Sequence, residues 1–500
     1  MTAPRLLHSL LDEAAEATPG RTALETATDS VTYGALATAS RNAAHLLRTA
    51  GVRRGDRVVI SSPDAITVTV AVHAASRAGA MFSVLHEQVR ERPLEHVLTD
   101  CEPAVLVTDD PGVSATATAH GVRVLGSREV REAPGPREGA GPSLPAPLAV
   151  DAVCLIYTSG TTSLPKAVVC THQQMLFAVH AIQDRLAYRA DDVVYSPLPL
   201  SFDYGLYQVF LTFLAGARLR AGSVAETGPP LLRSLETSGA TVLASVPSVS
   251  DRLAWLVRRA RNRPRLRLLT NTGAALADTT IATLREAMPT LSVQLMYGLT
   301  ECKRATIMPP DGDLRRPGSS GTALPGTEVF TIGDDGARLG PGEIGQFVVR
   351  GPHVMAGYWR RPELTAERFH LREGLFPELR TGDYGRLDED GYLYFSGRRD
   401  DLYKERGFRV SATEVEAAAR RVEGVASAAV LPPGPENGGT AVLAVVGDLA
   451  PSEVLDRMRG LIEEYKIPRR CVPVPELPVN TNGKTDRRAL TALIHDAAHS

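Results

Sequence analysis

The sequence predicts an α/β protein in two unequal parts, a large N-terminal domain over residues 1–399 and a small α+β domain over 400–500. Three observations lead to this prediction. A chain of 500 residues is too long for one ordinary domain. From residue 57 to residue 297, short apolar runs alternate with helical stretches, which is typical of layered α/β architecture. After residues 396–401 the pattern changes, and the remaining length of about 100 residues is a normal domain size.

The elements of the large domain follow from periodicity. The N-terminal segment predicts a short amphipathic helix, because Leu6, Leu7, Leu10 and Leu11 share one side. Strands are then expected at 57–61, 104–108, 153–157, 193–196, 241–245, 267–271 and 293–297, with a helix over 65–79. Residues 131–149, rich in Pro, Gly and Glu, are expected to form a loop.

Shorter, turn-rich strands at 328–332 and 345–351 indicate a β-rich subdomain at the end of the large domain. In the small domain, a helix over 411–423 is expected to start at Ser411, with Glu414 three residues on as in a capping box. Strands at 425–431 and 440–446, a helix over 451–465 and a strand at 471–474 complete it.

Composition excludes several classes of protein. The 55 Lys and Arg residues balance 57 Asp and Glu, and a net charge of -2 argues against a general nucleic-acid binder. No apolar run reaches the roughly 18 residues that a membrane span needs, and the N-terminus turns acidic before a signal-peptide core could form. The cysteines are odd in number and form no CxxC pair, which argues against a disulfide framework or a zinc site and favours a reducing cytoplasm. They are Cys101, Cys154, Cys170, Cys302 and Cys471.

The strongest local signal is YTSGTTSLPKA, from Tyr157 to Ala167, which directly follows a buried strand. Its amides and hydroxyls can bind phosphate oxygens, and Lys166 adds positive charge. It is not a Walker A loop, which needs GxxxxGK[ST]. An ordinary polar loop is the alternative.

Lysine is rare in this chain. Only five of its 55 basic residues are lysines: Lys166, Lys303, Lys404, Lys466 and Lys484. Where arginine is used almost everywhere else, a retained lysine is a candidate for a role that needs a compact ammonium. Chance retention is the alternative, so position must decide.

The stretch 157–167 resembles the phosphate loop of the adenylate-forming superfamily, which comprises acyl- and aryl-CoA synthetases, nonribosomal peptide synthetase adenylation domains and luciferase. The usual form of that loop is [YF]TSGTTGxPKG, and here Ser163 and Ala167 stand where glycine is usual. Six further stretches resemble motifs of the family in the expected order: 271–276, 297–301, 380–385, 397–401, 405–410 and 479–490. The resemblance covers residues 10–490 and implies ATP and Mg²⁺ as cofactors.

The resemblance also implies roles for individual residues. Those expected to bind ATP are Thr158, Ser159, Gly160, Thr161, Thr162 and Lys166 at the phosphates, Gly273, Ala274, Ala275, Tyr297 and Gly298 along the adenine, Thr300 at the α-phosphate, and Asp383 and Arg398 at the ribose. Glu301 is expected to bind Mg²⁺, and Lys484 to bridge carboxylate and phosphate oxygens. Asp400 resembles the hinge of a mobile C-terminal domain, and Lys404 a residue used after that domain rotates. A solvated charged loop is the alternative for these last two.

The stretch 196–210 resembles the family segment that opens the acyl pocket, and it contains Phe202-Asp203. In the peptide-synthetase branch the aspartate of a similar motif binds the substrate's amino group, which suggests an amino acid substrate, including β-amino or aryl types. Alternatively, Asp203 caps the following helix. The other residues expected to line the pocket are Tyr204, Tyr207, Ser248, Thr272, Gly273, Met296 and Arg304. Arg304 is expected either to pair with a second substrate carboxylate or, as the favoured alternative, to form a surface salt bridge.

Four functions are therefore compared. The favoured one is a stand-alone, AMP-forming acid–thiol ligase that passes its acyl group to the phosphopantetheine thiol of a carrier protein supplied in trans. The others are an acyl- or aryl-CoA ligase with free CoA as acceptor, a non-catalytic nucleotide- or acyl-binding member, and adenylation with an unusual acceptor. No nucleic-acid or membrane partner is expected.

Overall fold

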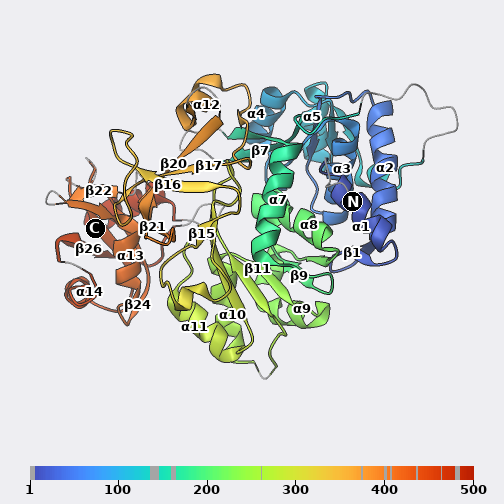
Figure 1. The fold of residues 1–500 in the computed structure, drawn as a ribbon. Coiled ribbons are helices and arrows are strands. Elements are labelled where there is room, and N and C mark those ends of the chain that lie inside the picture. Colours follow the sequence, from blue (N-terminus) through green and yellow to red (C-terminus); the bar gives the residue numbers. More distant parts are fainter. Residues whose placement is uncertain are drawn as a thin grey trace. The chain divides into compact units, whose positions relative to one another are not determined.

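The computed structural model describes residues 6–135, 146–158, 165–260, 262–372, 376–398, 402–405, 408–434, 437, 439–462, 464–478 and 485–499. Contacts divide the chain into two compact units. Unit 1 comprises Met1–Val329 and Val348–Arg380, and unit 2 comprises Phe330–Phe347 and Thr381–Ser500. The predicted α/β class is confirmed (Figure 1).

A nine-stranded sheet forms the first layer of unit 1. Its strands, in spatial order, are β15 (Thr322–Ala323), β14 (Thr306–Ile307), β13 (Ser292–Tyr297), β12 (Leu268–Asn271), β11 (Val242–Ser245), β9 (Val193–Ser196), β10 (Arg218–Ala221), β1 (Thr22–Glu25) and β2 (Ser30–Thr32). The run from β13 to β1 is parallel. The carboxyl ends of parallel strands meet at one edge, which is where open α/β sheets bind ligands.

A seven-stranded sheet forms the second layer. Its order is β18 (Gly357–Tyr358), β8 (Lys166–Thr171), β7 (Ala152–Thr158), β4 (Met81–Val84), β3 (Arg57–Ile60), β5 (Val105–Val107) and β6 (Arg123–Leu125). Strands β7 and β8 are antiparallel, with Thr158 opposite Lys166. Strand β7 was predicted from the sequence, whereas β8 was not. Because the two strands pair, the phosphate-loop motif connects the strands of a hairpin.

The helices of unit 1 cover these sheets. They are α1 (Ser9–Ala17), α2 (Tyr33–Thr49), α3 (Ala65–Ala78), α4 (Glu91–Cys101), α5 (Pro111–Ala119), α6 (Ser127–Arg131), α7 (His172–Leu186), α8 (Asp203–Ala215), α9 (Leu231–Ser238), α10 (Pro247–Val257), α11 (Asp278–Ala287) and α12 (Pro362–Arg368). The predicted helix over 65–79 is α3. Asp64 caps its N-terminus, and Gly79 ends it at φ 76°, a left-handed conformation that favours glycine.

Helix α8 differs from the amphipathic helices of the surface. Every residue from Asp203 to Phe213 is buried, as is typical of a helix that packs in a core on all sides. In Figure 1 it lies beside α7, and it contacts strands β9 and β10. This environment places the carboxylate of Asp203 inside the protein.

A five-stranded sheet follows, in the order β16 (Glu328–Ile332), β17 (Gly345–Arg350), β20 (Phe376–Leu387) and β19 (Phe369–Arg372), with β21 (Leu393–Arg398) also paired to β20. Its first two strands are those of the predicted β-rich subdomain. A hairpin of β22 (Leu402–Glu405) and β23 (Phe408–Ser411) precedes the C-terminal elements.

The C-terminal elements form a three-stranded sheet and its helices. They are α13 (Ala412–Arg420), β24 (Val425–Leu431), β25 (Val442–Gly447), α14 (Pro451–Met458), β26 (Arg470–Pro473) and α15 (Arg487–His499). The predicted cap is confirmed, because the Ser411 hydroxyl accepts a hydrogen bond from the amide of Glu414. Helix α14 ends before the predicted residue 465, and Gly460, a poor helix former, follows it.

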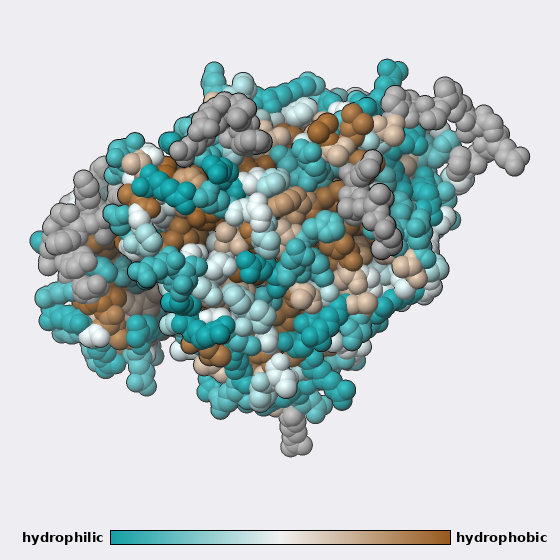
Figure 2. Space-filling view, viewed as in Figure 1, coloured by the Kyte–Doolittle hydropathy of each residue, from teal (hydrophilic) through white to brown (hydrophobic). Residues whose placement is uncertain are grey.

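The predicted domain boundary at residue 400 lies inside unit 2, and Asp400 is outside the described residues, so this boundary stays a prediction. Within the described part of the chain, none of the helices combines the length and apolar character that crossing a membrane requires. On the face shown in Figure 2, hydrophilic residues are spread widely, with apolar residues in smaller groups between them.

Candidate active site

Three turns meet at the carboxyl edge of the nine-stranded sheet. They follow β11, β12 and β13, whose register pairs Ser245 with Asn271 and Asn271 with Leu295. The predicted adenine-binding residues occupy two of the turns: Gly273, Ala274 and Ala275 after β12, and Tyr297 and Gly298 at the end of β13. The first three are exposed next to the buried Thr272. The structure therefore brings these predicted residues together.

The turn after β13 is tightly closed. A Cβ at Gly298 would lie 2.1 Å from the carbonyl oxygen of Lys303, so only glycine fits there. The amide of Ala305 donates to the carbonyl of Tyr297 at 2.9 Å. Within this turn Thr300 is half-buried, whereas the Glu301 side chain is almost fully buried.

Glu301 is held by Tyr358, a residue not among the predicted site residues. The Tyr358 hydroxyl donates to Glu301 Oε1 at 2.6 Å, and Lys166 Nζ lies 4.0 Å from the centre of the Tyr358 ring. Burial lowers the pKa of Lys166, an effect that the charge of Glu301 opposes. The predicted magnesium ligand and the predicted phosphate lysine thus flank one tyrosine.

The donor set around Glu301 fits Mg²⁺. Among the described residues, no group of three or more His, Cys, Asp or Glu side chains is placed to hold a metal. Mg²⁺ is commonly held by one or two carboxylates together with the phosphates of a substrate. Glu301 would provide one such carboxylate beside Lys166, the predicted phosphate lysine.

The ends of the phosphate-loop motif lie in the β7–β8 hairpin. Thr158 and Lys166 are opposite each other, and His96 Nε2 lies 2.8 Å from the Pro165 carbonyl oxygen. Ala167 is buried in the core, in one of the two positions where the family usually has glycine. The predicted residues Ser159, Gly160, Thr161 and Thr162, and also Ser163, lie outside the described residues.

Asp203 does not cap helix α8. It is the first helical residue, the N-cap is Phe202, and no side chain makes a capping hydrogen bond. The Asp203 carboxylate instead faces two cations, with Lys303 Nζ 2.8 Å from Oδ1 and Arg304 Nη1 3.8 Å from Oδ2. The capping alternative is therefore wrong, because the carboxylate of Asp203 is directed to the turn after β13.

Arg304 does not form the surface salt bridge that was favoured from the sequence. Its side chain is 7% exposed, so a surface salt bridge is wrong. Its guanidinium lies 4.6 Å from the centre of the Tyr204 ring, and Nη1 donates to the Lys303 carbonyl at 2.6 Å. Tyr204 is fixed in turn, because its hydroxyl donates to the Thr270 carbonyl on β12 at 3.0 Å.

Lys303 is one of the five lysines of the chain, and the sequence alone indicated no role for it. It is completely buried and has φ 64°, a strained conformation for a residue with a side chain. Burial acts to lower its pKa, but the charge of Asp203 outweighs this effect, and the pKa of Lys303 lies above its ordinary value. The ammonium is therefore charged. Its retention among so few lysines was the signal that could have found it.

Of the remaining predicted pocket residues, Tyr207 lies beside this charge cluster. Tyr207 is buried with its ring centre 5.4 Å from Lys303 Nζ, and its hydroxyl has no hydrogen-bond partner among the described residues. Thr272 is buried after β12, Met296 is buried in β13, and Ser248 is exposed in the first turn of α10.

The predicted ribose residues lie in unit 2. Asp383 on β20 is buried and directly opposite Arg398 on β21, so the structure makes these two residues cross-strand neighbours. The amide of Asp383 donates to the Thr381 hydroxyl at 3.1 Å. Lys404 lies on β22, and its side chain, like that of Arg398, is outside what the structure describes. Lys484 and Asp400 lie outside the described residues.

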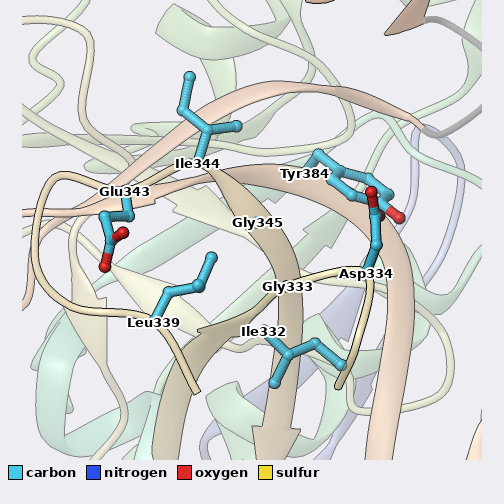
Figure 3. Close-up of a pocket in the computed structure, with 8 residues that line it drawn as sticks. All are labelled: Ile332, Gly333, Asp334, Leu339, Glu343, Ile344, Gly345 and Tyr384. Carbon is cyan, nitrogen blue, oxygen red and sulfur yellow. The ribbon is translucent and has the colours of Figure 1, made fainter. Parts of the chain in front are cut away.

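A cavity of about 410 Å³ lies elsewhere in unit 2 (Figure 3). Its lining consists of Ile332, Gly333, Asp334, Leu339, Glu343, Ile344, Gly345 and Tyr384. Because side chains alternate along a strand, Tyr384 and Asp383 point to opposite faces of β20. The cavity therefore lies on the face away from the predicted ribose carboxylate.

Comparison with known proteins defines the class of protein. Residues 11–359 match the family described as AMP-binding enzyme, and residues 414–484 match the AMP-binding enzyme C-terminal domain. The chain belongs to the AMP-binding enzyme family, and the resemblance seen in the sequence is confirmed.

Three relatives illustrate the similarity. The L-proline–[L-prolyl-carrier protein] ligase of Streptomyces coelicolor (strain ATCC BAA-471 / A3(2) / M145) is 31% identical over 92% of this chain and 92% of its own. The crystal structure of VinN is 40% identical with a TM-score of 0.72, covering 78% of this chain and 98% of that one, and a second VinN structure contains L-aspartate. Bacitracin synthase 3 of Bacillus licheniformis is 28% identical over 97% of this chain. This chain spans only 8% of that synthase, and 19% of each of two plipastatin synthase proteins of Bacillus subtilis (strain 168) that it also matches.

Proposed function

We propose that this protein is an AMP-forming acid–thiol ligase that uses ATP and Mg²⁺ to activate a carboxylic acid. A carboxylate oxygen attacks the α-phosphorus, the bond to the pyrophosphate oxygen breaks, and an acyl adenylate forms. A thiol then attacks the acyl carbon, so that a thioester and AMP result. The family to which the chain belongs supports this reaction.

One observation carries the proposal. A single turn after β13 contains Thr300 and Glu301, which are predicted to act on ATP, and shortly after them Lys303 and Arg304 beside Asp203. In this reaction the substrate carboxylate must approach the negatively charged α-phosphate. Preorganised cations lower the free energy of the transition state in which the two meet. Mg²⁺ on Glu301 would neutralise charge on the phosphates, and Lys166 and Lys484 would supply fixed positive charge near them.

The buried charges favour an amino dicarboxylic acid as substrate. Lys303 and Arg304 are two cations against the one carboxylate of Asp203, and a buried surplus charge requires an anion. A second carboxylate of the substrate would provide that anion. Asp203 can accept more than one hydrogen bond, so it can also receive the substrate's ammonium. The complex of the similar protein VinN with L-aspartate supports this choice.

A panel of four acids tests the proposal through pyrophosphate release. Aspartate carries both carboxylates and the amine, whereas β-alanine and alanine each lack one carboxylate and succinate lacks the amine. We expect an amino dicarboxylate, with aspartate as the first member tested, to give the highest kcat/KM. Preference for β-alanine would contradict the proposal that Arg304 binds a second substrate carboxylate. Preference for succinate would contradict the proposal that Asp203 binds the substrate's ammonium.

The acceptor is proposed to be the phosphopantetheine thiol of a carrier protein, with residues 400–500 as the C-terminal domain that carries Lys484. The similarity to a prolyl-carrier protein ligase supports this choice. Free CoA is the second candidate. Supplying the enzyme with each acceptor in turn and following thioester formation by mass spectrometry decides between them. ATP binding without pyrophosphate release from any acid would favour a non-catalytic member instead.

A further inference from the structure

Tyr358 occupies a position between two predicted ATP-binding groups. Its hydroxyl donates to Glu301 Oε1 at 2.6 Å, and Lys166 Nζ lies 4.0 Å from its ring centre. Tyr358 is 4% exposed and Glu301 is 7% exposed, so water does not compete freely for either contact. No described residue hydrogen-bonds to the second oxygen of Glu301, Oε2.

The tyrosine is itself fixed from several directions. Strand β18 pairs with β8, which places Tyr358 opposite Val168, two residues after Lys166. The amide of Tyr358 donates to the Thr365 hydroxyl at 2.9 Å, and the Phe369 ring packs edge-on against its ring at 5.5 Å.

The backbone around Tyr358 and Glu301 is fixed as well. Gly357 has φ 125°, and a Cβ there would lie 2.4 Å from a methyl carbon of Thr365. The amide of Met355 donates to the carbonyl of Glu301 at 2.9 Å. This segment therefore holds both ends of the hydrogen bond between Tyr358 and Glu301.

We propose that Tyr358 is a positioning residue for the nucleotide and its metal: its hydroxyl orients the Glu301 carboxylate toward Mg²⁺, and its ring holds the Lys166 ammonium at the phosphates. The proposal rests on the proposed function. Because Oε1 accepts a hydrogen bond from the hydroxyl, the Glu301 carboxylate would bind the metal through its other oxygen, Oε2. A group that orients a metal ligand commonly matters by about 10–100-fold in metal affinity.

Tyr358→Phe isolates the hydroxyl, because the ring and its contact with Lys166 remain. We expect the Mg²⁺ concentration that gives half-maximal ATP affinity, measured by titration calorimetry, to rise about 10-fold. Tyr195→Phe is the matched control, since the Tyr195 hydroxyl also donates to a carboxylate, Glu226 Oε2, at 3.0 Å. That variant should keep the Mg²⁺ requirement of the wild type.

A double-mutant cycle with Glu301→Gln distinguishes positioning of Glu301 from a general effect of Tyr358 on folding. If Tyr358 acts through Glu301, then Tyr358→Phe should add little to the effect of Glu301→Gln in a double-mutant cycle on Mg²⁺-dependent ATP binding. Additive effects, or a Tyr358→Phe protein whose melting temperature falls while its Mg²⁺ requirement is unchanged, would overturn the proposal.

The two proposals fail in different ways. Calorimetry needs no turnover, so a wild-type protein that binds ATP with Mg²⁺ but releases no pyrophosphate would contradict the proposed function alone. In that case an increased Mg²⁺ requirement in Tyr358→Phe would still support positioning of Glu301. An unchanged Mg²⁺ requirement in an active enzyme would overturn only the role of Tyr358.

Discussion

Lys303 Nζ lies 2.8 Å from Asp203 Oδ1, and both side chains are buried although they come from different elements, the turn after β13 and the start of α8. Removing one partner of a buried pair leaves an uncompensated charge. We expect Asp203→Leu to destabilise unit 1 by about 3–5 kcal/mol, measured as a shift of the urea midpoint. The double variant Asp203→Leu/Lys303→Met should recover much of this loss.

Glu132→Gln is the control for that measurement, because its partner Arg128 is 87% exposed. Exposed pairs contribute only about 0–1 kcal/mol. If the Asp203→Leu protein were as stable as Glu132→Gln, the buried charge of Lys303 would not need the Asp203 carboxylate for stability.

Arg304→Met tests the selection of a second carboxylate. The guanidinium is buried against Tyr204, so no nearby water replaces it easily. We expect kcat/KM for the preferred amino dicarboxylate to fall about 10–100-fold, the range for a hydrogen bond to a charged group. The kcat/KM for β-alanine should change far less. Equal losses for both substrates in pyrophosphate-release assays would argue that Arg304 has only a structural role.

Much of the fold was predictable because it depends on local patterns. Apolar runs such as 193–196 and 425–431 coincide with strands β9 and β24, and the Ser411 cap is where the sequence places it. Strand β8 was missed because its short run directly follows a polar loop. The hairpin is set by pairing with β7 and β18, which local sequence does not encode.

The site was only partly predictable, because contacts between elements distant in sequence are not encoded locally. Motif resemblance found Glu301 and Asp203, but their partners Tyr358 and Lys303 are set by tertiary packing. Asp203 was weighed as a helix cap because Asp is common at that position. Burial of α8 from Asp203 to Phe213 decided otherwise, and it also buried the carboxylate that faces Arg304.

Lys484 and Lys404 are predicted to serve different half-reactions. Lys484→Ala should reduce pyrophosphate release by about 10²–10³-fold, because a fixed charge at the reacting oxygens is lost. Lys404→Ala should leave pyrophosphate release near normal and reduce thioester formation instead. Lys466→Ala is the matched control, since Lys466 pairs with Glu414 on α13. Near-normal pyrophosphate release by Lys484→Ala would show that this lysine is assigned incorrectly.

Three histidines around α1, α3 and α7, the half-buried His8 and the fully buried His73 and His172, predict loss of stability in acid. Burial, reinforced by Arg77, lowers the pKa of His8 to about 3. Burial likewise lowers the pKa of His73 and of His172 to about 4 in each case. His172 Nδ1 accepts a hydrogen bond from the Leu7 amide at 3.0 Å, so protonation of that nitrogen would break the contact.

The sign follows from proton uptake. The unfolded chain binds protons on these histidines near their ordinary pKa of 6.5, whereas the folded chain does so only near 3 to 4. Stability is therefore fully present above about pH 6.5 and falls as the pH is lowered toward 4. Burial acts to raise the pKa of Asp12, but Arg77 outweighs it, so this lowered pKa adds to the loss only below the ordinary value of 3.8. Urea midpoints measured from pH 8 to 4.5 should decline below pH 6.5, and His73→Asn should decline less steeply. A flat profile over that range would mean that the histidines take up protons as readily in the folded as in the unfolded protein.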